Sequence, residues 1–305
     1  MSAKASQPSA SPQAAAGGSQ TLIFIASFLT LIAAGMGFGA RGEILGQWAR
    51  YGFTKTDLGQ ISGFGLAGFG GIILIASLVT DRIGYKAIML AAFVCHLVSA
   101  GILLAADSIF NTQGTAGAFR YLSLGMTIFS VGNGLCEAAI NPLVATLYPT
   151  KKTHYLNILH AGWPGGLVLG ALCGKYLGHM GWQVPMLAFL VPTLLYGLIT
   201  LVKRFPTSEA TKAGVSYGTM FAQLAYPLMI VLLLLHALVG YVELGTDSWI
   251  SSITNKISLG QGAYLFIYAS TMMFILRFFA GPIVERINPL GLLFVTRFWG
   301  RPGYT

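Results

Sequence analysis

AFRYLSLGMTIFSVGNGLCEAAINPLVATL, residues 118–147 of the chain, is an apolar run in which Glu137 is the sole carboxylate. The nearest charged residues are Arg120 at its start and Lys151 beyond its end. A helix that crosses a membrane needs about 20 mostly apolar residues. An ionisable group within such a helix is costly and marks a candidate functional site. The stretch therefore predicts a membrane-spanning helix with a functional carboxyl group near its middle.

Similar apolar runs fill most of the chain. Only 9% of the residues are charged and 55% are hydrophobic, whereas soluble domains carry about 25% charged residues. We expect spanning helices at residues 21–40, 58–79, 87–106, 118–147, 155–177, 184–202, 221–250 and 262–280, with a ninth beginning near Leu290. The sequence thus predicts an all-α integral membrane protein.

Glycines lie inside these runs, most densely at Gly63, Gly65, Gly68, Gly70 and Gly71. Small residues let helices in lipid approach one another closely. We therefore expect this part of the second span to form a packed face.

The distribution of basic residues predicts the orientation in the membrane. One set of loops holds Arg82, Lys86, Lys151, Lys152, Lys203, Arg204, Lys212 and Arg286, whereas the opposite set holds mainly Arg50, Lys55 and Lys256. Cytoplasmic loops carry the excess of Lys and Arg. We expect a multi-pass protein of the inner or plasma membrane with its N-terminus in the cytoplasm, where residues 1–20 form a disordered tail.

Several classes of function are excluded by the sequence. The net charge of +9 is spread over short loops and forms no basic patch for nucleic acid. Cys95, Cys136 and Cys173 lie in apolar runs without the spacing of a metal site or a disulfide framework. Hydrolase motifs such as HExxH and GxSxG do not occur. We expect neither a metal, a cofactor nor an enzymatic activity.

Two loops resemble each other and divide the chain into halves. Residues 80–86 read TDRIGYK and residues 281–289 read GPIVERINP, each with an acid beside an arginine after the second helix of its half. Repeated halves with the substrate held between them are common in secondary transporters. We expect a six-helix bundle at 21–202, a cytoplasmic linker at 203–219 and a partial second bundle at 220–305.

The first of these loops resembles the signature loop of the major facilitator superfamily. The matching positions are Asp81, Arg82, Gly84 and Lys86, while Ser77 stands where that family usually has glycine. The resemblance implies a cytoplasmic gate that latches the two halves together, and the repeat adds Glu285 and Arg286 to it. It also implies twelve helices, so we expect a chain truncated after the first half and two to three helices of the second.

The fourth span resembles one branch of that superfamily more closely. NGLCEAAINP at 133–142, followed by HYLN at 154–157, is similar to the pattern of the fucose–proton symporters. The resemblance implies that Glu137 couples transport to protons, and an acid at the position of Glu43 is implicated in proton transfer there. The alternatives are a permanently neutral structural Glu137, and a Glu43 that is an exposed acid paired with Arg41.

Candidate substrate-binding residues lie on the fourth, fifth and seventh spans. They are Asn133, Asn141, Asn157, His160, Trp163 and Glu243. Residues four apart share a helix face, which places Asn133 and Asn141 with Glu137. The resembling symporters have Gln and Asn where this chain has His160 and Trp163, which argues against fucose itself. Ordinary packing is the alternative for each, and we expect Arg277 and Arg120 to extend to the membrane interface.

The resemblance implies a transporter that carries a sugar or similar small polar solute together with protons, and we expect it to be monomeric. A proton-coupled drug or metabolite antiporter is the first alternative, because GWPGGLVLG at 162–170 loosely resembles an antiporter motif. An inactive fragment of a transporter and a receptor that moves no solute are the others.

Overall fold

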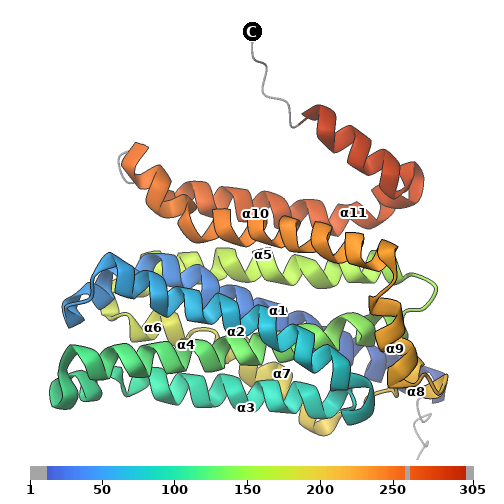
Figure 1. Cartoon of the computed structure of the whole chain (residues 1–305), viewed down its shortest axis with the longest axis horizontal. Helices are drawn as coiled ribbons and strands as arrows, with labels where there is room; N and C mark the ends of the chain where they lie inside the picture. The colour runs from blue at the N-terminus through green and yellow to red at the C-terminus, as the bar shows by residue number, and fades with distance from the viewer. Residues whose placement is uncertain (1–11, 258–261, 300–305) are drawn as a thin grey trace, which may run out of the picture.

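The computed structural model describes residues 12–257 and 262–299, and within these ranges every regular element is a helix. The elements are α1 (Pro12–Trp48), a short 3-10 helix η1 (Ala49–Tyr51), α2 (Lys55–Ile83), α3 (Tyr85–Leu104), α4 (Ala106–Leu147), α5 (Lys152–Leu177), η2 (Gly178–Met180), α6 (Gln183–Leu187), α7 (Leu190–Val202), α8 (Glu209–Lys212), α9 (Tyr217–Leu224), α10 (Pro227–Ile257) and α11 (Gly262–Trp299). Figure 1 shows the long helices lying side by side as a bundle.

Seven of these helices are long and apolar enough to cross a membrane. They are Gly18–Gly42, Lys55–Ile83, Tyr85–Leu104, Ala106–Leu147, Lys152–Met180, Gln183–Val202 and Gly262–Val284. An eighth candidate is the pair Tyr217–Leu224 and Pro227–Glu243, bent by 71°. The all-α membrane fold is therefore confirmed, with the six spans of the first half complete.

Three boundaries differ from the prediction. Helix α1 begins at Pro12, so residues 12–20 are helical where a tail was expected; proline suits a first turn and alanines follow it. The seventh span bends before Pro227, which cannot continue a helix, whereas the predicted sixth span matches the candidate span Gln183–Val202, within which Ala188 and Phe189 separate α6 from α7. Helix α11 runs through Pro289, so no separate helix begins near Leu290; Figure 1 shows its last part turning away from the first.

The glycine seam joins α1 to α5 and consists of Gly35, Gly39, Gly166 and Gly170. A Cβ atom at any of them would collide with backbone atoms of the other helix. The expectation of a packed face in α2 is wrong for Gly63, Gly70 and Gly71, because a Cβ there would meet nothing within 4 Å. Small residues do mark close helix packing in this protein, but on α1 and α5 rather than on α2.

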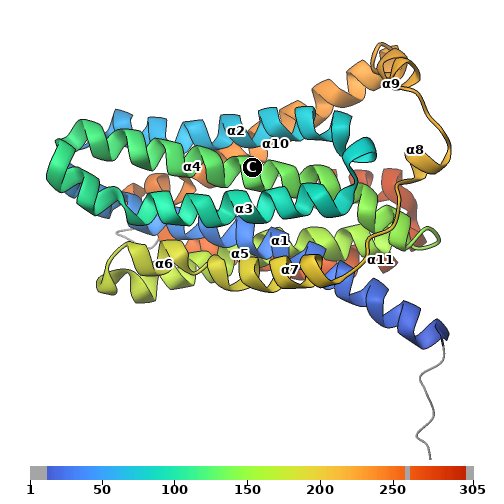
Figure 2. The same ribbon diagram turned by 90° about the horizontal axis from the view of Figure 1, so that it is seen from below.

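The second half contacts the first mainly through α11, which lies along α5. Gly165 of α5 lies against Phe274, and Gly281 of α11 lies against His154. Further along, Phe266 packs with Leu167 and Ala171. Helix α10 lies beside α11 and contacts the first half much less than α11 does (Figure 1 and Figure 2). Helix α11 is thus the part of the second half that packs along α5, the helix of His160.

Candidate functional site

The central network begins with three half-buried side chains on α4 and α5. Asn141 Nδ2 donates to Glu137 Oε2 at 3.0 Å, as expected for residues one helical turn apart. His160 Nε2 lies 2.8 Å from Asn141 Oδ1. Because the Asn141 carbonyl oxygen can only accept, His160 Nε2 is the donor in this pair. The predicted shared face of Glu137 and Asn141 thus matches the structure, and His160 of α5 joins them through Asn141.

Two residues of the second half complete the central network. Arg277 of α11 lies 3.9 Å from the Glu243 carboxylate of α10, and each side chain is 33% exposed. The positive charge of Arg277 also acts on Glu137 and on His160. The guanidinium of Arg277 is thus paired with an acid of its own half, and its position at the membrane interface stays a prediction.

Asn133 does not join the central network, although it lies one turn before Glu137. It is 1% exposed, and its Oδ1 lies 2.9 Å from His96 Nε2. The other ring nitrogen of His96 lies 2.9 Å from the Tyr196 hydroxyl. These three side chains tie α3, α4 and α7 together inside the first bundle. In this structure Asn133 is therefore out of reach of a solute between the halves.

The remaining predicted residues are spread around this region. Asn157 Nδ2 donates to its own helix, to the carbonyl oxygen of Thr153 at 2.9 Å. The Trp163 ring lies 5.0 Å from that of Phe38 and is stacked at 6.4 Å on that of Phe69. Glu43 belongs to α1, but its side chain lies outside the described part of the structure. Trp163 thus contributes to an aromatic cluster rather than to the hydrogen-bonded network.

Comparison with known proteins decides the family. The model of the Major Facilitator Superfamily matches residues 17–299. The chain belongs to this superfamily. Members of the superfamily are membrane transporters rather than enzymes, which agrees with the spanning helices and with the predicted class of function.

One curated relative of this facilitator is the tetracycline resistance protein, class E, of Escherichia coli. It is 24% identical over 135 residues, which cover 44% of this chain and 30% of the relative. The match thus spans less than a third of the relative's own length. No solved structure matched the chain.

The residues predicted to form a cytoplasmic gate contact the segment predicted to be a linker. Lys86 Nζ donates to the carbonyl oxygens of Leu201 and Lys203 at 2.9 and 3.1 Å. The Arg82 guanidinium lies 3.9 Å from the centre of the Tyr217 ring. The described contacts therefore join this loop to the end of α7 and to α9.

The remaining residues predicted for the gate are Asp81, Gly84, Glu285 and Arg286. Thr211 of α8 donates to the Asp81 carbonyl oxygen at 2.6 Å, and Gly84 has a φ of 89°, which suits glycine. Arg286 is exposed, and the side chain of Glu285 lies outside the described part. A contact between the two repeated loops stays a prediction.

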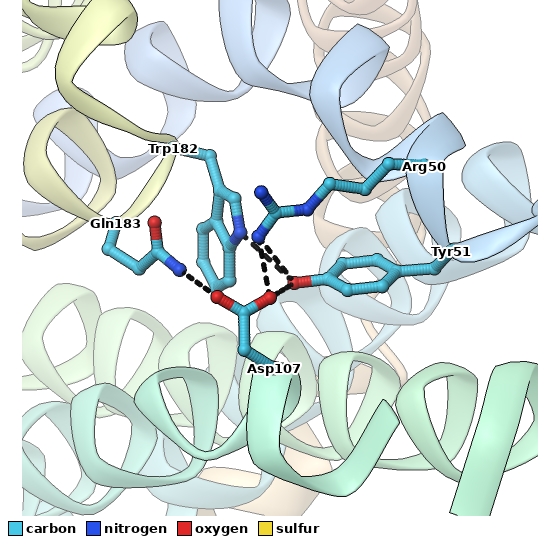
Figure 3. A network of polar contacts seen from close by, with 5 residues as sticks. All are labelled: Arg50, Tyr51, Asp107, Trp182 and Gln183. Carbon is cyan, nitrogen blue, oxygen red and sulfur yellow. Dashed lines mark hydrogen bonds and ion pairs between the residues drawn. The ribbon is translucent and has the colours of Figure 1, made fainter. Parts of the chain in front are cut away.

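The outer cluster lies at the opposite end of the first bundle and consists of Arg50, Tyr51, Asp107, Trp182 and Gln183 (Figure 3). Asp107 Oδ1 accepts from Arg50 at 2.5 Å and from the Tyr51 hydroxyl, and Oδ2 accepts from Gln183. Trp182 Nε1 donates to the Tyr51 hydroxyl at 3.1 Å. One carboxylate therefore holds three connections of the bundle together. Burial raises the pKa of Tyr51.

Proposed function

We propose that this facilitator couples the movement of a small polar solute to protons, with Glu137 as the group that gains and loses the proton. The observation that carries the proposal is the central network, in which Glu137, half-buried on α4, accepts a hydrogen bond from Asn141, which His160 of α5 contacts in turn. When Glu137 gains or loses a proton, its attraction to Arg277 of the second half changes. The setting we propose is an inner or plasma membrane, with a cytoplasmic N-terminus and a monomeric protein.

In the proposed mechanism the carboxylates of Glu137 and Glu243 compete for Arg277. In this structure Arg277 is paired with Glu243, and Glu137 accepts from the Asn141 amide. An apolar surrounding favours neutral Glu137, which leaves Arg277 to Glu243. Loss of the proton makes Glu137 a second anion that attracts Arg277, and α11 is then drawn toward α4. Protonation and the relative position of the halves are thereby linked.

Two directions of transport fit this network. Symport of a sugar or similar small polar solute is supported by Asn141 and His160, which can bind hydroxyl groups, and by the fucose-symporter pattern around Glu137. Proton-coupled antiport of a drug or metabolite is supported by the similarity to the tetracycline resistance protein. The sign of solute movement under a pH gradient distinguishes them.

The test is transport by the chain reconstituted in proteoliposomes. L-fucose, tetracycline and benzoate serve as probes for a neutral sugar, a drug and a carboxylate, and uptake by protein-free liposomes is subtracted because neutral benzoic acid crosses lipid unaided. With one proton per solute, a gradient of one pH unit supplies about 1.4 kcal/mol and supports about tenfold accumulation of the transported probe. Glu137→Gln is expected to abolish this accumulation and to retain exchange of the same probe without a gradient.

Glu209→Gln is the matched control, because Glu209 is an exposed acid of the linker whose partner is Lys152. It is expected to accumulate solute like the wild type. Accumulation by Glu137→Gln at the wild-type level would show that another group carries the proton. Failure of all three probes to move would contradict the proposed solute classes.

A further inference from the structure

Arg41 is a buried cation whose charge the central network does not use. The residue lies on α1 and is 5% exposed. Its Nη2 is buried and has no hydrogen-bond partner in the described residues. A buried charge is costly unless it is paired and hydrogen-bonded. A guanidinium left in this state within a transporter indicates a binding group.

The acids in the described part of the molecule do not serve as its counterion. Glu137 accepts from Asn141, and Glu243 is paired with Arg277. No acid among the described side chains is thus paired with Arg41.

The surroundings of Arg41 are aromatic and apolar. Its Cζ lies 4.0 Å from the centre of the Phe38 ring. The Phe38 ring lies 5.0 Å from that of Trp163 and 6.4 Å from that of Phe69. Phe266 of α11 belongs to the apolar cluster that packs against Phe38 and Trp163. The guanidinium thus lies at the edge of an aromatic cluster that the second half covers.

We propose that Arg41 binds the anionic group of the solute, so that the transported compound is an organic anion with a carboxylate and a flat apolar body. The proposal rests on the proposed function and narrows its solute class. A guanidinium can bind a carboxylate through two parallel hydrogen bonds, and the rings of Phe38, Phe69 and Trp163 suit a planar apolar body. Because α11 covers the cluster here, the solute enters when α11 moves away from α5.

If Arg41 binds the solute, replacing it is expected to stabilise the ligand-free protein. If Arg41 is structural, replacing it is expected to destabilise the protein. Replacing a buried, unpaired charge by an apolar side chain of similar length removes its desolvation cost. Arg41→Met is therefore expected to melt at a higher temperature than the wild type. If Arg41 instead held the fold together, the same substitution would lower the melting temperature.

The experiment measures thermal unfolding of the full chain in lipid nanodiscs with benzoate or benzamide, which share a ring and differ in charge. A ligand that binds the folded state raises Tm with its concentration. We expect benzoate to raise the Tm of the wild type and benzamide to leave it unchanged. Arg41→Met is expected to lose the benzoate shift entirely. Arg41→Lys keeps the charge without the bidentate geometry, and a weakened shift is expected.

Arg120→Gln is the matched control, because Arg120 is an exposed arginine of α4, and it is expected to keep the full benzoate shift. Equal shifts with benzoate and benzamide, or none with either, would overturn the proposal. A full benzoate shift in Arg41→Met would also overturn the proposal. A Tm of that variant below the wild-type Tm, measured without ligand, would overturn it as well. If Arg41→Met does not fold, a full benzoate shift in Arg41→Lys overturns the proposal and a weakened one supports it.

Failure of the anion site is distinguishable from failure of proton coupling. Glu137→Gln is expected to keep the benzoate shift, since Glu137 has its own partner in Asn141. Benzoate that binds through Arg41 but does not accumulate under a pH gradient would refute the coupling and leave the anion site standing. Proton-coupled movement of L-fucose without any benzoate shift would refute the anion site and leave the proton coupling standing.

Discussion

The outer cluster and the central network are both built around a carboxylate, but they differ in how completely it is satisfied. Both oxygens of Asp107 accept hydrogen bonds, and all its partners belong to the first half. Glu137 accepts from Asn141 on its own helix, and the nearby Arg277 is held loosely, at 3.9 Å, by Glu243. A saturated cluster within one half fixes a single arrangement, whereas a partly satisfied network across two halves can exchange partners.

The largest effect on stability is expected from breaking the outer cluster at its centre. Asp107→Ala leaves the Tyr51 hydroxyl and Gln183 without their acceptor, and Arg50 keeps only the Tyr51 hydroxyl. The expected loss is about 1–3 kcal/mol in the free energy of unfolding, because partly buried donors stay unpaired. Unfolding in detergent by denaturant measures it. Proton-driven accumulation per folded molecule is expected to stay unchanged, and its loss would show that the cluster belongs to the transport machinery.

A smaller effect is expected from removing one hydroxyl of the same cluster. Tyr51→Phe keeps the ring, which packs 5.0 Å from Phe110 and 5.7 Å from Phe53. The lost hydrogen bonds are worth about 1 kcal/mol of unfolding free energy. A double-mutant cycle with Asp107→Ala measures how much of this depends on the carboxylate. Strict additivity of the two substitutions would show that the hydroxyl and the carboxylate are not coupled.

In the central network we expect substitutions to affect transport more than stability, the reverse of the outer cluster. His160→Gln keeps a donor near Asn141 but removes the imidazole, and we expect a change of less than about 0.5 kcal/mol in stability, because the site is half-buried and loosely paired. Exchange at equilibrium is expected to persist while accumulation under a pH gradient falls. A stability loss as large as that of Asp107→Ala would show that both regions are structural.

The smallest effect concerns pH. Burial raises the pKa of Tyr51 above its usual value of about 10, so folding favours the neutral phenol. This contribution is complete below the unfolded pKa and is lost as pH rises through the higher folded pKa. The stability difference between wild type and Tyr51→Phe is therefore expected to be constant from about pH 7 to 9 and to shrink above about pH 10. A difference that already changes near neutral pH would point to another titrating group.

The spans and the core of the central network were predictable because they depend on local pattern. Glu137 and Asn141 are one turn apart on α4, and His160 lies on α5, the next long helix. Asn133 was misplaced because helical spacing gives a face but not the tertiary partner, here His96. The pairing of Arg277 with Glu243 was missed because it depends on how α10 packs against α11.

The outer cluster gave no signal in the sequence. Arg50 lies in η1, Asp107 in the first turn of α4 and Trp182 just before α6, so only the packing of the bundle brings them together. The bend in the seventh span was also missed, because uniform hydropathy conceals a bend. Pro227 was the available sign for the seventh span, since proline favours the first turn of a new helix.

The glycine seam has a practical consequence for following this protein in motion. Because the backbones of α1 and α5 touch at Gly35, Gly39, Gly166 and Gly170, the two helices cannot slide past each other without a collision. Spectroscopic labels on the lipid-facing sides of α1 and α5 therefore keep a constant separation through the cycle and form an internal ruler. A third label on α11 then reports, against that ruler, how far the second half travels.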